Sequence, residues 1–225
     1  MNKKGLAVYA LLIVLLPIAI LILSGNAMLR VSASYGYHFN DIQASDMVDS
    51  SLSNAELAGE ITGYFNSFGG DEEFQIYEQN GEFLDPVFDD LEVLAMKRAK
   101  RVMTWTLVAG GIVFVSVLII YVYLALKGEK RTLRISGIIA AAVTFAALIA
   151  KIVLVVGNAF RGKLYARFIG VALSEESSLR LILGSPMERV YLVFSSVFAL
   201  ILIIVFLYIT LRLTKEKGMF SGSIS

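Results

Sequence analysis

Four apolar runs, each long enough to cross a lipid bilayer, constrain this chain more than any other feature. They are Leu6–Leu23, Val102–Leu126, Ile135–Val156 and Val190–Leu211. A helical run of ~20 residues spans the ~30 Å hydrocarbon core at ~1.5 Å of rise per residue. Hydrophobic residues make up 57% of the chain, which exceeds the share in soluble domains. The sequence therefore predicts an integral membrane protein with four spanning helices.

The segments around these runs define the predicted organisation. We expect an all-α membrane protein, a four-transmembrane-helix bundle with a small extracytoplasmic α+β insertion after the first span. That insertion is too short for a large independent enzyme domain. The expected parts are a first span at 6–24, the extracytoplasmic helix-hairpin-helix domain at 25–101, a second span at 102–126, a cytoplasmic loop at 127–134, a third span at 135–156, a second extracytoplasmic loop at 157–189, a fourth span at 190–212 and a cytoplasmic tail at 213–225.

The insertion contains signals for one helix and one hairpin. Ser53 and Glu56 have the spacing of a capping box, which predicts the start of a helix. Asn80-Gly81 is a turn signal between short alternating segments, so we expect strands at 74–78 and 82–84. Two sets of apolar residues are expected to form a small core. They are Leu57, Ile61, Tyr64, Phe65 and Phe68 on the helix, and Phe74, Ile76, Phe83 and Leu84 on the hairpin.

One long helix is predicted to join the insertion to the membrane. Asp85 is a suitable N-cap residue and Pro86 suits the first helical position. No helix breaker follows before Leu126, so we expect one helix of roughly 60 Å. The preceding helix and the hairpin are expected to pack on its outer half.

Basic residues near the spans predict the orientation. Lys3 and Lys4 precede the first run, and the basic segment 127–134 joins the second and third runs. Cytoplasmic loops carry an excess of such bases, so we expect a plasma-membrane protein with both termini in the cytoplasm. The bases at 97–101 and 161–167 fall on the outer side and oppose this rule. The chain has no cysteine, which excludes disulfides and thiol chemistry.

The sequence lacks a P-loop, a nucleophile elbow and a metal-ligand cluster, so we expect neither a cofactor nor a metal. The candidate catalytic residues are Glu92, Lys151 and His38. Lys151 lies within the third run, where a lysine is either functional or extends to the headgroups. His38 lies among aromatic residues, which favours a packing or surface role. Glu92 or Lys151 could act as a base only with a strongly shifted pKa.

Bases gather at the predicted outer ends of the second and third spans. If these spans are neighbours, the bases converge on one cleft that suits an anionic headgroup or a lipidated peptide. We therefore expect a membrane lipid or lipoprotein as partner, and no nucleic acid. The alternative is that each base is solvated separately or pairs with an acid. The predicted lipid-binding residues are Lys97, Lys100, Arg101, Lys151, Arg161, Lys163 and Arg167.

Two motifs carry a resemblance to a known family. Glu92-Val-Leu-Ala95-Met-Lys-Arg98-Ala99-Lys100 precedes the second span, and Leu183-Gly-Ser-Pro186-Met-Glu188 enters the fourth. Together with the order of parts, they resemble the lipoprotein intramolecular transacylases of low-GC Gram-positive bacteria. That family has histidine where this chain has Ala95, and aspartate where it has Arg98. A second family histidine, paired with an aromatic residue, corresponds to Ala166 in this chain.

The resemblance implies movement of an acyl chain within a lipoprotein's diacylglyceryl cysteine, from the glycerol sn-2 oxygen to the α-amino nitrogen. Such a transfer needs a base with a near-neutral pKa, a role that histidine fills best. Because both family histidines are absent, we expect a non-catalytic or divergent member that binds lipid or lipoprotein. Two alternatives stand beside it, an acyltransferase with a non-histidine base and an unrelated structural subunit of a membrane complex.

Overall fold

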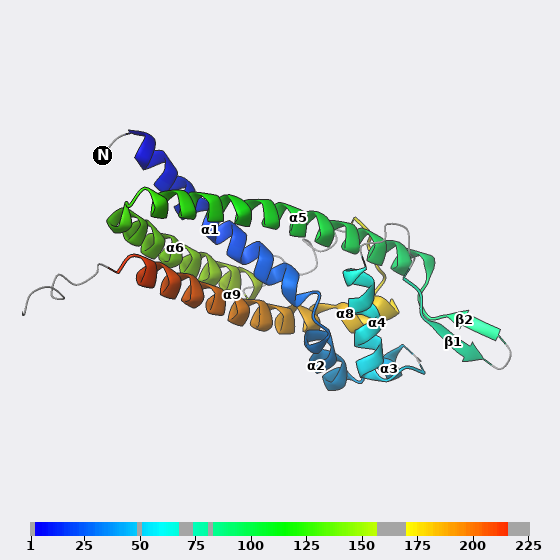
Figure 1. Ribbon diagram of the computed structural model, residues 1–225. Helices are drawn as coiled ribbons and strands as arrows, with labels where there is room; N and C mark the ends of the chain where they lie inside the picture. Colours follow the sequence, from blue (N-terminus) through cyan, green and yellow to red (C-terminus); the bar gives the residue numbers. More distant parts are fainter. Residues whose placement is uncertain (1–2, 49–50, 68–73, 81–82, 157–169, 216–225) are drawn as a thin grey trace, which may run out of the picture.

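The computed structural model describes residues 3–48, 51–67, 74–80, 83–156 and 170–215. Its longest helices coincide with the four apolar runs, and they form a bundle that carries a smaller head at one end (Figure 1). All four are long and apolar enough to cross a membrane, which confirms the predicted four-helix membrane fold. They are α1 (Lys3–Met28), α5 (Asp90–Leu126), α6 (Lys130–Val156) and α9 (Ser185–Leu213).

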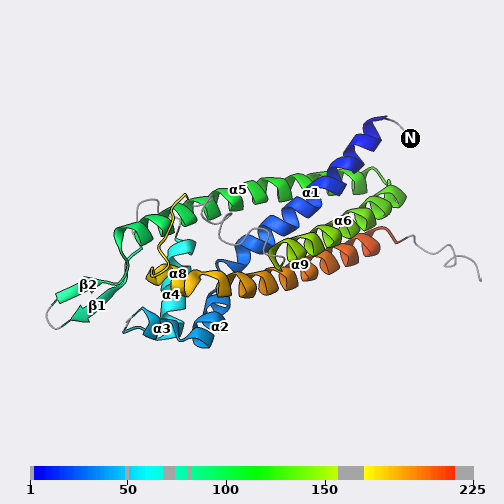
Figure 2. The ribbon, with the colours of Figure 1, turned by 180° about the vertical axis from the view of Figure 1, so that it is seen from behind.

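Helix α1 lies at the centre of the bundle. It packs against α5, α6 and α9, and it crosses between α5 and the other two in both views (Figures 1 and 2). Leu12 and Leu16 of α1 are fully or almost fully buried in one core that includes Ala140 and Ala199. Small residues opposite leucine allow helices in lipid to approach closely.

The outward faces of these helices are apolar as well. Ile112, Ile119, Val156 and Ile204 are between 63% and 65% exposed. Apolar faces of this extent are unfavourable in water but match the hydrocarbon core of a bilayer, where all backbone groups of a helix are already paired. The bundle therefore has the surface of a multi-pass membrane protein.

The head consists of three helices of the insertion, a short helix before α9, a hairpin and the first turns of α5. Its apolar residues form one core that is separate from that of the bundle, with Phe39, Leu57, Phe88 and Ile182 among its buried members. The elements are α2 (Ser32–Ile42), α3 (Ala44–Met47), α4 (Asn54–Asn66), β1 (Tyr77–Asn80), β2 (Phe83–Pro86) and α8 (Ser178–Leu183).

The predicted capping box is present at the start of α4. Ser53 Oγ accepts from the backbone N–H of Glu56, and the Glu56 carboxylate accepts from the backbone N–H of Ser53. The apolar face of this helix is buried as predicted, at Leu57, Ile61, Tyr64 and Phe65. Phe68 lies outside the described residues.

The hairpin is present, but its strands lie further along the chain than predicted. Asn80 pairs with Phe83 and Tyr77 pairs with Pro86. Phe74 and Ile76 are buried in the head core before β1 begins, so they anchor the base of the hairpin. The strands themselves project away from the bundle (Figures 1 and 2). The prediction that the hairpin packs against the long helix therefore holds for Phe74 and Ile76, which share a core with residues of α5, and is wrong for the two strands.

The start of the long helix was also predicted too early. Asp85 and Pro86 belong to β2, and α5 begins at Asp90. Asp89 is the N-cap, because it forms a reciprocal capping box with Glu92. From there α5 continues unbroken for 37 residues, about 55 Å at ~1.5 Å per residue. Its charged first turns belong to the head and its apolar part to the bundle.

Candidate functional site

Glu92 joins α5 to α8. Its side chain is only 3% exposed, and Oε2 accepts from the backbone N–H of Asp89 at 2.9 Å. The other oxygen, Oε1, accepts from Ser177 Oγ at 2.5 Å and from the backbone N–H of Leu179 at 2.9 Å. Because Ser177 is the N-cap of α8, this one carboxylate holds the starts of two helices together. The candidate catalytic glutamate thus occupies a structural position with three donors.

His38 lies in the interior of the head. It is 1% exposed, and its Nε2 is 3.1 Å from the carbonyl oxygen of Ile182 in α8. A carbonyl can only accept, so Nε2 carries the hydrogen and donates it. Burial lowers the pKa of His38 below its ordinary value, which keeps the imidazole neutral at pH 7. The only histidine of the chain therefore forms part of the packing between α2 and α8.

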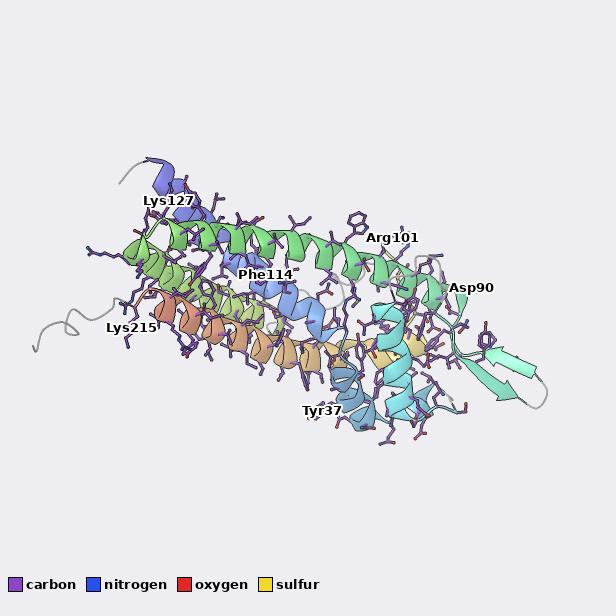
Figure 3. The ribbon with its side chains drawn as sticks, viewed as in Figure 1. Tyr37, Asp90, Arg101, Phe114, Lys127 and Lys215 are labelled. Atoms are coloured by element: carbon purple, nitrogen blue, oxygen red, sulfur yellow. The ribbon has the colours of Figure 1, made fainter. Side chains whose placement is uncertain are left out.

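The bases at the head end of α5 point in different directions. Lys100 is buried, where its Nζ donates to Ser67 Oγ at 2.7 Å and lies 4.3 Å from the centre of the Tyr64 ring. Arg98 Nη1 donates to the carbonyl oxygen of Gly170 at 2.7 Å. Arg101 is exposed on the outer side of α5 (Figure 3). Lys97 is partly buried.

Lys151 is turned from α6 onto α9. Its Nζ donates to Ser195 Oγ at 2.8 Å and lies 5.2 Å from the centre of the Tyr191 ring. Helix α1 packs closely against Tyr191 at Gly25, where an added Cβ would lie 2.5 Å from the Tyr191 hydroxyl oxygen. Lys151 and the α5 bases thus have their partners on different helices. The hydrogen bonds of Lys100, Arg98 and Lys151 given above share no partner.

Three of the predicted lipid-binding residues, Arg161, Lys163 and Arg167, lie outside the described residues, as does Ala166. Within the described ranges, no three His, Cys, Asp or Glu side chains gather as a metal site would require.

Polar residues that join helices were not all predicted from the sequence. Ser195 and Ser196 form a polar pair inside an apolar run, and this was a detectable signal. Asn26 lies three residues after the first run and four residues before Arg30, a spacing that places both on one helical face. Asn26 Nδ2 donates to the carbonyl oxygen of Met103 at 2.6 Å, and Arg30 Nε donates to Asn26 Oδ1 at 2.9 Å. The bond from Asn26 to Met103 fixes α1 to α5 where the bundle meets the head, and Arg30 holds the Asn26 side chain in place.

Four helices long and apolar enough to span a membrane, with a head at one end of their bundle, define an integral membrane protein. No protein-family model matches the sequence, and no curated protein sequence matches it significantly. Solved structures of the membrane-integral lipoprotein intramolecular transacylase Lit from Bacillus cereus do match the fold.

One Lit structure has a TM-score of 0.67 at 14% sequence identity, and the match covers 94% of this chain and 98% of that one. Two further Lit structures carry a substitution of one histidine, by alanine or by arginine. Both have a TM-score of 0.69, and their sequence identities are 16% and 15%. Each match covers 94% of this chain, and the matches cover 94% and 92% of the two Lit chains. The chain therefore has the Lit fold over nearly its whole length, in agreement with the resemblance found in the sequence.

Proposed function

We propose that the protein binds a ligand that carries acyl chains, either a membrane lipid or the acylated end of a lipoprotein. We further propose that it does not catalyse histidine-dependent acyl transfer. The fold that it shares with Lit supports a ligand of this kind. The observation that carries the second part is the placement of His38. This sole imidazole is 1% exposed and its Nε2 donates to a backbone carbonyl, so burial keeps a substrate away from Nδ1, the ring nitrogen that could still accept a proton.

The motif at the start of α5 supports the same conclusion. Ala95 occupies the position to which the resemblance assigns a histidine, and it is 3% exposed within the head core. A methyl group cannot transfer a proton. Glu92, the matching glutamate, already accepts three hydrogen bonds. Neither residue offers a base to an acyl-transfer reaction.

We place the ligand beside the head end of α5. Arg101 and Trp105 lie one helical turn apart on the exposed face of this helix, and Trp105 is 68% exposed. An arginine beside an interfacial tryptophan suits the boundary between headgroups and acyl chains. The remaining predicted lipid-binding residues of this region, Lys97, Arg161, Lys163 and Arg167, stay part of this proposal, whereas the ammonium of Lys100 is buried in the head.

A second candidate function is acyl transfer with Lys151 as the base. The 2.8 Å distance between Lys151 Nζ and Ser195 Oγ favours it, because an amine beside a hydroxyl is one known arrangement for an activated serine. Ser195 is, however, completely buried, so a substrate carbonyl has no access to its hydroxyl. Binding is therefore the better-supported function.

Binding can be tested by native mass spectrometry of the purified protein in neutral detergent. We expect it to retain a synthetic dipalmitoylglyceryl-cysteine peptide and not the same peptide without acyl chains. Trp105→Ala should weaken retention several-fold, because it removes the exposed ring at the proposed site. Tyr123→Ala, an exposed aromatic of the same helix at the other end, is the matched control. Equal retention of both peptides would contradict the proposal.

We also propose that the head lies outside the cytoplasm, as the basic turn between α5 and α6 suggests. The natural chain has no cysteine, so single substitutions report on one position each. An impermeant maleimide should label Asn80→Cys in intact cells and Glu129→Cys only after permeabilisation. The reverse labelling pattern would show that the head lies in the cytoplasm.

A further inference from the structure

Lys151 is an ammonium inside a spanning helix with no carboxylate partner in the described part of the chain. Arg180 and Glu175, in the segment before α9, form an ion pair that does not involve Lys151. Lys151 Nζ has three N–H donors, and Ser195 Oγ accepts one of them. The Tyr191 ring supplies a second, non-anionic contact. Two donors remain for a further acceptor.

The chain itself offers little negative charge around this ammonium. Residues 157–169, which directly follow α6, contain three bases and no acid. Glu188 is the acid that precedes Tyr191 on α9, and it forms no ion pair with Lys151 in the described structure. An ammonium in hydrocarbon is unfavourable without a counter-charge, and the usual relief is extension to the headgroups. Lys151 instead turns across to α9.

The surroundings of Lys151 suit a phospholipid. The residue lies five positions before the end of α6, about 7.5 Å along the helix at ~1.5 Å per residue. Leu154, three positions after Lys151 and therefore on the same side of α6, presents an exposed apolar side chain. A phosphate drawn to the ammonium would therefore leave its acyl chains against apolar helix faces.

We propose that Lys151, positioned by Ser195 and Tyr191, binds the phosphate of an anionic phospholipid seated against α6 and α9 at the head end of the bundle. This site goes beyond the proposed function, because it lies on α6 and α9 rather than beside α5 and because it names an anionic phospholipid as its ligand. The lipid supplies the negative charge that the adjacent segments of the chain lack.

The test is a native mass spectrometry titration with phosphatidylglycerol in neutral detergent. Lys151→Met keeps the length of the side chain and removes its charge, so we expect the tightest binding step to weaken by about tenfold, the loss of one charge-assisted hydrogen bond. Lys151→Arg should retain binding. Lys130→Met is the matched control, since Lys130 is an exposed lysine at the opposite end of α6. Equal weakening by Lys151→Met and Lys130→Met would overturn the site.

Two ligand controls separate the sources of the anion. Neutral diacylglycerol should not compete with phosphatidylglycerol, and inorganic phosphate should not replace it. Competition by inorganic phosphate alone would replace the lipid assignment with a free-anion site. Unchanged lipopeptide binding in Lys151→Met would leave the proposed function intact, so failures of the two proposals can be told apart.

Thermal unfolding distinguishes a ligand site from a structural lysine. In neutral detergent without phospholipid, Lys151→Met should unfold at a higher temperature than the natural protein, because an unneutralised charge has been removed from the bundle. Phosphatidylglycerol should then stabilise the natural protein and not the variant. A lower unfolding temperature with unchanged stabilisation by phosphatidylglycerol would mean that Lys151 is structural, and the proposal would be wrong.

Discussion

Glu92→Ala is expected to destabilise the head by about 3 kcal/mol, the largest effect of any single polar substitution considered for this chain. The change removes an acceptor of three hydrogen bonds, and it leaves the backbone N–H of Leu179 and the hydroxyl of Ser177 without that partner. Buried donors that lose a charged acceptor keep their full desolvation cost. Thermal unfolding of the purified protein, followed by circular dichroism, measures the loss.

Glu56→Ala is the matched control for this effect. Glu56 and Glu92 are both the third residue of a helix with a reciprocal capping box, on α4 and α5. Glu56 is exposed, and its recorded hydrogen bonds are confined to its own cap. Its removal should therefore shift unfolding only slightly. Equal shifts for the two variants would show that the bonds from Glu92 to Ser177 and Leu179 contribute little.

Gly110→Leu should disrupt the crossing of α1 and α5. A Cβ at Gly110 would lie 2.7 Å from Ile22 Cγ2 and 3.3 Å from Leu23 Cδ2. Ile22 is β-branched and has little rotamer freedom in a helix, so the helices must separate instead. Overpacking of this kind costs roughly 1–3 kcal/mol and more when the backbone cannot move. The expected result is a lower unfolding temperature in detergent.

The neighbouring glycine provides the comparison. An added Cβ at Gly111 meets no atom within 4 Å, so Gly111→Leu should leave the unfolding temperature nearly unchanged. Both substitutions add the same side chain to adjacent positions of one helix. A loss of stability at both positions would mean that altered contact with detergent, rather than the α1–α5 contact, controls the result, because leucine is the better helix former.

The spans were predictable because hydrophobic length alone determines them. The start of α5 was not, although the deciding signal was in the sequence. Asp85 and Asp89 are both good N-cap residues, and Pro86 favoured the first. Only Asp89 has a glutamate three residues later, and the reciprocal bonds with Glu92 determine where the helix begins. The capping box therefore outweighed the proline signal.

The partners of the charged residues could not be predicted, because they depend on how the helices face one another. Lys100 was expected beside the other bases, yet its ammonium contacts Ser67 and Tyr64 near the end of α4. Lys151 was identified as an unusual residue within a span, but nothing in the sequence pairs it with Ser195 on α9. Residue spacing predicts which side chains share one face of a helix. It does not predict which other helix packs against that face.

The measurement that tests the central claim most directly is the position of the acyl chains on a dipalmitoylglyceryl-cysteine peptide after incubation with the purified protein. Intramolecular transfer leaves the total mass unchanged, so fragmentation by tandem mass spectrometry must locate each chain. The proposed function predicts that both palmitoyl groups stay on the glycerol while the peptide is bound. An N-palmitoylated cysteine that forms with the native protein, and not with heat-denatured protein, would contradict binding without transfer.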